Sequence, residues 1–267
     1  MKTILKYPGS KGSMRDTIID MMPAHKLYGE PYGGSAAVLL AKPSAAVEWY
    51  NDTFAEVLNL FKIIRAGGEQ LAQLCAMVEL TAFSRAELAL ARSFPVGISD
   101  IERARMFLTR SWLSYGGSLS NHKSGFRTSK NDTKRLVTWN GLSDRLKVCA
   151  ERFKDVYIEQ IDATKFMMAL DSQDALFYVD PPYPEATLNF REKQVYDQPF
   201  LMSQHEDLLC VLQNLKAKVI LSGYRCELYD DLLTLDNGWQ RTDIDHITQA
   251  HSTKTECLWT NFYRPQP

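Results

Sequence analysis

An apolar run at residues 175–179, Ala-Leu-Phe-Tyr-Val, ends at the tetrapeptide Asp180-Pro181-Pro182-Tyr183. Five consecutive apolar residues bounded by a turn signal predict a strand buried inside a sheet. The two prolines fix φ and lack N–H groups, so the segment after the strand can be neither helix nor central strand. The tetrapeptide therefore occupies the carboxyl end of a core strand.

The tetrapeptide also has a chemical consequence. Carbonyl groups that no helix or sheet uses can accept hydrogen bonds from a ligand, and the carboxylate of Asp180 adds a second acceptor. Two converging acceptors suit an exocyclic amino group, which has two donors. The ring of Tyr183 offers a face on which a base can stack. On these residues alone, a proline-rich turn without a ligand is the alternative interpretation.

Strand and helix patterns alternate on both sides of a long helical stretch. The first part predicts strands at 26–30 and 46–50 and helices at 14–22, 36–41 and 54–65. The last part predicts strands at 156–162, 175–179 and 218–222, a helix at 204–215, and a hairpin of strands at 239–247 and 255–262. Such alternation implies a parallel sheet. We predict an α/β fold with a Rossmann-like, mostly parallel sheet and a C-terminal antiparallel hairpin.

The stretch between these parts is predicted to be a helical insert. Helical patterns at 71–80, 84–93, 100–115 and 142–153 surround a polar, glycine-containing segment at 116–134. We therefore divide the chain into a domain formed by residues 1–66 and 154–267 and an insert at 67–153.

Composition limits the partners and the compartment. The 267 residues include 31 basic and 32 acidic side chains, so a nucleic acid must be held by a local patch rather than by the net charge of −1. The five cysteines are scattered without a Cys-x-x-Cys pair, which indicates the cytoplasm and neither disulfides nor a zinc site. The histidines form no i, i+4 pair, so we expect no metal. No apolar run approaches the roughly 20 residues of a membrane span, so we expect no membrane partner.

A glycine turn and a downstream acid suggest a nucleotide-like ligand. Residues 30–35, Glu-Pro-Tyr-Gly-Gly-Ser, lie between a predicted strand and a predicted helix, and Asp52 follows the next strand, 18 residues beyond Gly34. An acid at about this offset meets a ribose hydroxyl in nucleotide-binding α/β folds. The pattern lacks a full G-x-G-x-x-G motif, so a simple glycine-rich turn is the alternative. Lys11, beside Gly9, could meet a cofactor carboxylate or be a solvated loop lysine.

Residues 120–135 carry a dense positive charge. Five cations against one acid, Asp132, give this stretch a charge of +4. We favour contact with phosphates over a solvated loop, because the stretch lies in an insert between two halves of a nucleotide-binding fold. The five predicted DNA contacts are Lys123, Arg127, Lys130, Lys134 and Arg135.

Taken in order, these motifs resemble the Dam-type DNA adenine-N6 methyltransferases, including phage and prophage members. The matching segments are 6–11 (Lys-Tyr-Pro-Gly-Ser-Lys), 30–34 (Glu-Pro-Tyr-Gly-Gly), 51–52 (Asn-Asp), 180–183 (Asp-Pro-Pro-Tyr), 221–224 (Leu-Ser-Gly-Tyr) and 255–261 (Thr-Glu-Cys-Leu-Trp-Thr-Asn). Two positions depart from the family pattern: Ala36 replaces a glycine and Tyr32 replaces a phenylalanine.

The resemblance implies S-adenosyl-L-methionine as cofactor, double-stranded DNA as substrate, and the insert as target-recognition region. A cognate restriction enzyme is a further partner that it suggests. It makes Asp180, Pro181, Pro182 and Tyr183 the catalytic residues. Asp52 would bind the ribose, and Asp162 would lie near the cofactor adenine. The full cofactor set that it implies is Tyr7, Lys11, Glu30, Pro31, Gly33, Gly34, Asp52, Asp162 and Asp180.

The implied mechanism uses the tetrapeptide directly. Asp180 and the carbonyl of Pro181 would accept the two protons of the adenine N6 amine, while the flipped base stacks on Tyr183. Cytosine-N4 methylation would use the same acceptors, and a DNA-binding module without catalysis is a second alternative. An NAD-dependent oxidoreductase is a third, although the dinucleotide fingerprint is missing.

Overall fold

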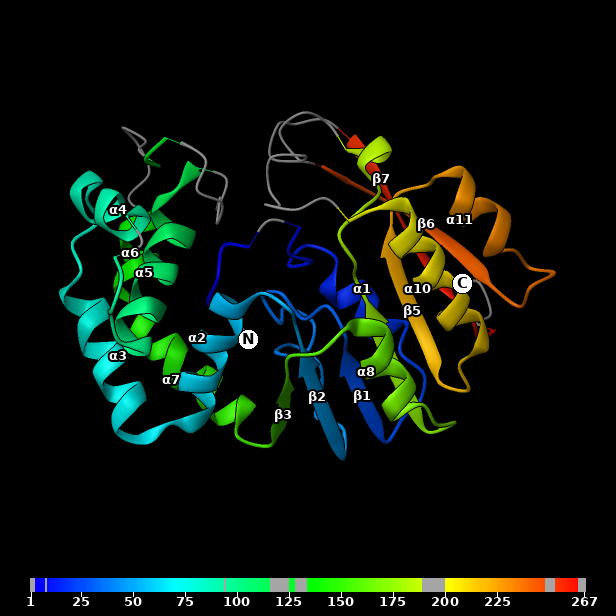
Figure 1. The fold of residues 1–267 in the computed structure, drawn as a ribbon, viewed down its shortest axis with the longest axis horizontal. Coiled ribbons are helices and arrows are strands. Elements are labelled where there is room, and N and C mark those ends of the chain that lie inside the picture. The colour runs from blue at the N-terminus through cyan, green and yellow to red at the C-terminus, as the bar shows by residue number, and fades with distance from the viewer. Residues whose placement is uncertain are drawn as a thin grey trace. The chain divides into compact units, whose positions relative to one another are not determined.

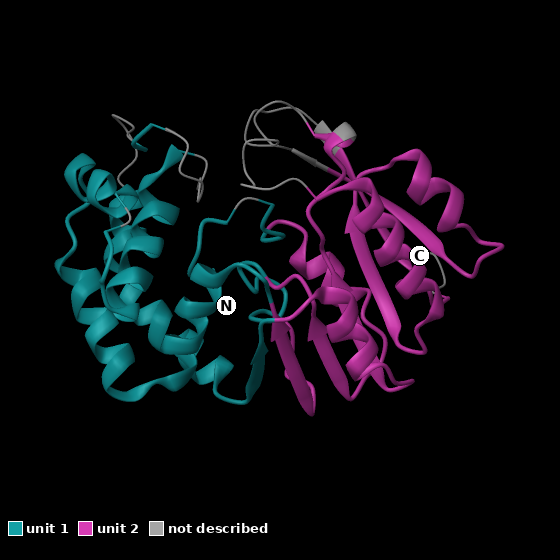
Figure 2. Cartoon of the chain, in the orientation of Figure 1, with its two compact units in different colours: residues 1–12, 34–41, 52–160 teal, residues 13–33, 42–51, 161–267 magenta. Residues whose placement is uncertain are grey.

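The computed structural model of the protein describes residues 3–7, 9–93, 95–115, 125–127, 134–188, 200–247 and 253–263. The chain forms two compact units, shown in Figure 2. Unit 1 comprises residues 1–12, 34–41 and 52–160, and unit 2 comprises residues 13–33, 42–51 and 161–267. Among the described residues, no helix is both long and apolar enough to cross a membrane.

The described strands form one sheet, and all of them except β4 are labelled in Figure 1. They are β1 (Leu27–Glu30), β2 (Val47–Asn51), β3 (Val156–Glu159), β4 (Ala175–Val179), β5 (Lys218–Gly223), β6 (Gln240–Ile247) and β7 (Thr253–Thr260). Their order is β3-β2-β1-β4-β5-β7-β6. β1 pairs in parallel with β2 and β4, and β4 with β5, whereas β7 is antiparallel to both β5 and β6. The predicted mostly parallel sheet with a C-terminal antiparallel hairpin is confirmed.

The core of unit 2 explains the apolar run that ends at Asp180. Every residue of β4 is buried. Phe177 and Val179 of β4 pack with Phe166 of α8 (Ala163–Leu170) and Leu208 of α10 (Met202–Asn214), and these helices lie across one face of the sheet (Figure 1). A parallel strand that is covered on both faces needs apolar residues at every position. The described part of this unit also contains α1 (Arg15–Asp20), α11 (Glu227–Leu232) and the short 3-10 helix η2 (Glu185–Thr187).

Unit 1 is a helical cluster around α5 (Asp100–Leu113). The other helices are α2 (Ala55–Ala66), α3 (Gly68–Leu80), α4 (Arg85–Arg92), α6 (Lys134–Asn140) and α7 (Leu142–Phe153). All of the last ten residues of α5 are buried, against α2, α3 and α4. The hydroxyls of Ser84 and Ser99 cap α4 and α5 by accepting backbone N–H groups. α2 also packs on α7. The division at residues 66 and 154 stays a prediction.

Several elements differ from the predictions. The predicted helix at 36–41 is wrong, because the segment forms turns, with Leu40 N–H donating to Ala36 O and Ala41 N–H to Val38 O. Ala36 has φ of +52°, a left-handed conformation that a right-handed helix cannot contain. The sequence patterns also missed three helices, α6, α8 and α11. All three are short, at six to eight residues, so they hold few turns from which a helical period could be recognised.

Candidate active site

The tetrapeptide lies at the point where the sheet reverses its winding. β1 and β4 are neighbours, β2 lies beyond β1, and β5 lies beyond β4. Glu30 is the last residue of β1, and Asp180 directly follows β4. Because these strands are parallel, their carboxyl ends meet at one edge of unit 2. Open α/β sheets bind their ligands at such a switch point.

Asp180 is held by a short chain of hydroxyl groups. The Ser222 hydroxyl donates to Asp180 Oδ1 at 2.8 Å, and the hydroxyl of Tyr178 lies 3.1 Å from Ser222 Oγ. Tyr178 and Ser222 are buried, whereas Asp180 is half-buried. Burial, followed by the charges of Asp180 and Glu256, raises the pKa of Tyr178 well above its ordinary value. Its hydroxyl therefore stays protonated and fixes the carboxylate through Ser222.

Tyr183 is anchored at its hydroxyl group. The hydroxyl donates to Glu256 Oε1 at 2.5 Å and lies 3.2 Å from Asp180 Oδ1. Its ring meets Tyr224 edge to face, with centroids 4.7 Å apart. Burial, followed by the charges of Asp180 and Glu256, raises the pKa of Tyr183 well above its ordinary value. Pro181 and Pro182 lie outside helix and strand, as predicted.

A second buried carboxylate, Glu30, ends the neighbouring strand. It is 2% exposed, and the hydroxyl of Tyr28 donates to its Oε1 at 2.8 Å. Lys42 Nζ lies 4.4 Å from the centroid of the Tyr28 ring and forms a buried ion pair of 2.7 Å with Glu48. The carboxylate of Glu30 is therefore held by Tyr28, whose ring in turn contacts the buried Lys42–Glu48 ion pair inside unit 2.

Asn51, the last residue of β2, ties the loops of this edge together. Its Nδ2 donates to the carbonyls of Pro31 and Ile161, and its Oδ1 accepts from the N–H of Ile161. The side chain is fully buried. Sequence reasoning assigned no role to Asn51, because its partners lie 20 and 110 residues away.

Position 33 has no room for a side chain, so it requires glycine. Its N–H donates to the carbonyl of Asn51 at 2.8 Å, and a Cβ at this position would lie 2.1 Å from the ring of Tyr50. Tyr50 is fully buried, so its ring has no room to give. The glycine turn is thus a close approach of backbone to a core side chain.

Asp162 has a structural partner in unit 2. Its Oδ1 accepts from the N–H groups of Thr164 and Lys165 and from the Thr164 hydroxyl, so it caps α8. Burial alone would raise the pKa of the Asp162 carboxyl, but these hydrogen bonds outweigh it and the pKa is lowered. The capping role adds a structural reason for an acid here, independent of the expected place near a cofactor adenine.

The remaining predicted cofactor residues belong to unit 1. Asp52 accepts the N–H of Gly34 on Oδ2 and that of Phe54 on Oδ1, both at 2.8 Å. Burial raises the pKa of Asp52, and these backbone groups oppose the shift. A Cβ on Gly34 would lie 3.2 Å from the Tyr7 ring. Lys11 is 5% exposed and donates to Gly9 O at 2.8 Å, so it is not a solvated loop lysine.

The basic stretch is described only in part. Lys123 and Lys130 lie outside the described residues, as does the side chain of Lys134. Arg127 and Arg135 are half-buried in unit 1. The pKa of Lys6 is lowered, first by burial and then by the charges of Arg127, Arg145 and Arg135. Lys6 is therefore a further member of this basic group, and sequence reasoning missed it because it lies more than 100 residues away.

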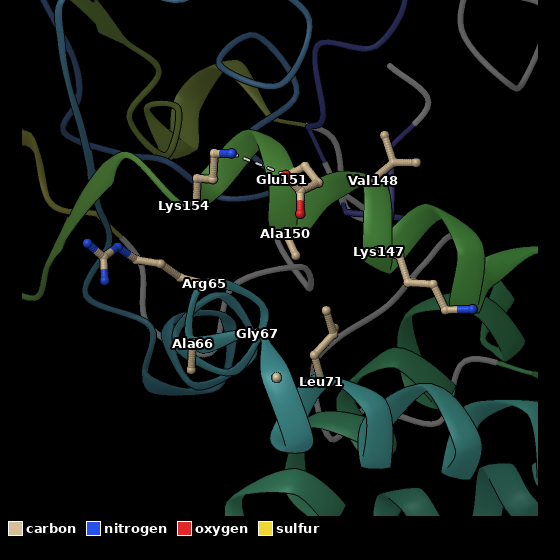
Figure 3. Close-up of a pocket in the computed structure, with 10 residues that line it drawn as sticks. Arg65, Ala66, Gly67, Leu71, Lys147, Val148, Ala150, Glu151 and Lys154 are labelled. Carbon is tan, nitrogen blue, oxygen red and sulfur yellow. Dashed lines mark hydrogen bonds and ion pairs between the residues drawn. The ribbon is translucent and has the colours of Figure 1, made fainter.

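A separate shallow pocket of about 530 Å³ lies on unit 1, where α2, α3 and α7 meet (Figure 3). Arg65, Leu71 and Lys154 are among its lining residues. The residues predicted for the active site lie elsewhere. Among the described residues, no group of three or more His, Cys, Asp or Glu side chains is placed to hold a metal ion.

The sheet and its switch point place the protein in the class of Rossmann-like α/β proteins. A family model of the D12 class N6 adenine-specific DNA methyltransferases matches residues 7–247, so the chain belongs to this family. It is an enzyme that methylates adenine N6 in DNA. The family match confirms the resemblance, and it favours adenine-N6 methylation over the cytosine-N4 and non-catalytic alternatives. No curated protein matches the chain.

Proposed function

We propose that the carboxyl edge of β1 and β4 is where a methyl group passes from S-adenosyl-L-methionine to the N6 amine of a flipped adenine. The observation that carries this proposal is the placement of Asp180 at the sheet's switch point, with Ser222 donating to its Oδ1 at 2.8 Å. An acceptor fixed in advance needs no reorganisation when charge develops on the amine.

The cofactor assignment is supported by charge. Asp180, Glu256 and Glu30 all act electrostatically on the hydroxyl of Tyr178, so three carboxylates gather around this buried group. Such an edge suits a cationic ligand, and S-adenosyl-L-methionine carries a sulfonium and an ammonium group. The cofactor supplies an electrophilic methyl group. Glu30 and the Gly33–Gly34 turn are proposed to approach its methionine part, and Asp162 its adenine.

Asp52 and Lys11 of unit 1 have proposed roles of their own in cofactor binding. Asp52 accepts the N–H of Gly34 on Oδ2 and that of Phe54 on Oδ1, and a carboxylate has about four lone-pair sites, so it can also accept a ribose hydroxyl. Lys11 brings a buried cation for the cofactor carboxylate, directly after the turn in which the Ser10 N–H donates to Tyr7 O.

The chemistry is proposed to rest on Asp180, Pro181 and Tyr183. The N6 lone pair is delocalised into the adenine ring, so the amine is a poor nucleophile. Hydrogen bonds from its two N–H groups to the Asp180 carboxylate and the Pro181 carbonyl shift electron density back to nitrogen, so that the lone pair can attack the methyl group. Pro182 keeps the backbone in its non-helical path, and the Tyr183 ring stacks on the base. A base must leave the duplex to reach such a pocket.

DNA contact is proposed for the insert at 67–153 and its basic group. The charges of Arg127 and Arg135 act on Lys6 within unit 1. Two hydrogen bonds join the Lys6 backbone to the hydroxyl of Ser111 in α5. They fix the backbone position of this cation next to α5. Lys123, Lys130 and Lys134 complete the proposed phosphate contacts.

The five cysteines are free thiols, which supports the proposal that the enzyme works in the cytoplasm. A cognate restriction enzyme as partner, and an origin in a phage or prophage, stay predictions.

The test is to express the chain in a host without DNA methylation and to sequence its DNA with detection of modified bases. We expect N6-methyladenine at one short recognition sequence, and none from the Asp180→Ala variant. N4-methylcytosine, or methylation that survives in the variant, would contradict the proposal.

A further inference from the structure

Glu256 is a buried carboxylate to which sequence reasoning gave no role. It lies on β7, where its neighbour Cys257 pairs with Gly223 of β5. Because β7 runs antiparallel to β5, its first residues lie at the edge where β4 and β5 end. Glu256 is 4% exposed and lies beyond the residues that the family model matches. A buried carboxylate is costly unless hydrogen bonds compensate it, so its presence at this edge calls for a reason.

The hydrogen bonds around Tyr183 show what Glu256 does. A phenol has one proton to donate, and the Tyr183 oxygen lies 2.5 Å from Glu256 Oε1 but 3.2 Å from Asp180 Oδ1. The shorter distance assigns the proton to Glu256, since strong O–H···O⁻ bonds fall at about 2.5–2.7 Å. Asp180 Oδ1 takes its proton from Ser222 instead.

We propose that Glu256 is a positioning residue for methyl transfer: it holds the Tyr183 hydroxyl, which fixes the ring for stacking and keeps the hydroxyl proton away from Asp180. This inference rests on the proposed roles of Asp180 and Tyr183. A second donor on the Asp180 carboxylate would weaken it as an acceptor for the adenine amine. Glu256 thus preserves the acceptor strength of Asp180 by holding the hydroxyl of Tyr183.

The other groups around the two carboxylates fit this assignment. Glu30 lies on β1, Tyr178 on β4, Ser222 on β5 and Tyr229 on α11, and the charge of Asp180 acts on both tyrosines. The pKa values of Tyr178, Tyr183 and Tyr229 are all raised, first by burial, so each hydroxyl stays a donor at neutral pH. In this edge cluster Glu256 is the acceptor closest to the Tyr183 hydroxyl.

The test compares two substitutions of Glu256. Glu256→Leu removes the acceptor, which frees the Tyr183 hydroxyl to turn toward Asp180, and we expect kcat to fall by about 30-fold, equivalent to about one strong hydrogen bond. Glu256→Gln keeps an acceptor oxygen, and we expect a fall of about 3-fold. The KM for S-adenosyl-L-methionine should change little in either variant.

Two readouts separate positioning from mere folding. Tyr183→Phe in the Glu256→Leu background removes the misdirected hydroxyl, so the double variant should be faster than Glu256→Leu alone. Glu256→Gln still holds the hydroxyl through its amide oxygen, so Tyr183→Phe should raise kcat less in that background than in Glu256→Leu. Parental kcat in Glu256→Leu, or a double variant slower than either single one, would overturn the inference.

Thermal unfolding and calorimetric cofactor binding serve as folding controls. If Glu256→Leu does not fold, Glu256→Gln still decides, since a parental kcat in that variant contradicts the inference. Activity in Asp180→Ala would instead refute the proposed function itself. An inactive Asp180→Ala beside a fully active Glu256→Leu would refute only the role of Glu256.

Discussion

The Asp180 edge of unit 2 and the basic group of unit 1 are built on different physical principles. At the Asp180 edge, buried polar atoms have partners at defined distances, such as Ser222 on Asp180 and Tyr28 on Glu30. In the basic group, half-buried or exposed cations such as Lys6 and Arg135 act on one another through charge. Activity should therefore fall sharply when a single atom at the Asp180 edge is removed. DNA affinity should instead change gradually with the charge of the basic group and with ionic strength.

The largest effect on stability is expected at Gly33, where the edge has no spare room. Gly33→Ala would place a Cβ 2.1 Å from the Tyr50 ring, and overpacking of this kind costs about 3 kcal/mol. Denaturant unfolding should show this loss together with weakened cofactor binding. Gly141→Ala is the matched control, because its Cβ would make only an ordinary 3.5 Å contact. Equal stability of the two variants would mean that the edge is looser than the contacts indicate.

The next effect is expected at Ser222. Ser222→Ala removes the donor to Asp180 and should lower kcat by about 10-fold, or about 1.4 kcal/mol. Tyr178→Phe removes only the outer hydroxyl of the chain and should cost less. Steady-state kinetics of both variants measure the gradient. A larger loss in Tyr178→Phe than in Ser222→Ala would reverse the assigned order of the chain.

In the basic group the expected effect is graded. Replacing Lys6 or Arg135 by Gln should each reduce the slope of log affinity against log salt by about 1, the value for one phosphate contact. Lys154→Gln is the control, since this exposed lysine pairs with Glu151 and lies at the pocket of Figure 3. DNA-binding titrations across a salt series provide the slopes. A Lys6→Gln slope equal to that of the control would remove Lys6 from the DNA interface.

The smallest effect is expected at Ala36. Its left-handed backbone costs about 1–2 kcal/mol, but glycine would lose a buried methyl group worth about 0.8 kcal/mol and about 0.4–1 kcal/mol of unfolded-state entropy. These contributions nearly cancel, so Ala36→Gly should change the unfolding free energy by less than about 1 kcal/mol. Denaturant unfolding measures it. A stabilisation of several kcal/mol would show that the alanine is strongly strained.

The comparison also shows what the sequence allowed us to predict. The Asp180 strand and α7 were predicted with their bounds, since a continuous apolar run and a long helical period are strong local signals. The turn at 36–41 was not predicted, because an alanine in the sequence does not indicate the left-handed conformation that Ala36 adopts. Asp180 was found through its motif. Ser222 and Glu256 were not found, because only strand pairing brings them into the site. Ser222 lies 42 residues from its partner Asp180, and Glu256 lies 73 residues from its partner Tyr183.

The most direct test of the account is single-turnover methyl transfer by Asp180→Ala and Asp180→Asn, with cofactor and DNA binding measured on the same preparations. If the Asp180 carboxylate accepts a hydrogen bond from the amine, Asp180→Ala should lose at least about 10³-fold in rate while it still binds DNA. Asp180→Asn keeps one acceptor oxygen, so its rate should fall between those of Asp180→Ala and the parent. An Asp180→Ala rate within about 10-fold of the parent would contradict the central claim.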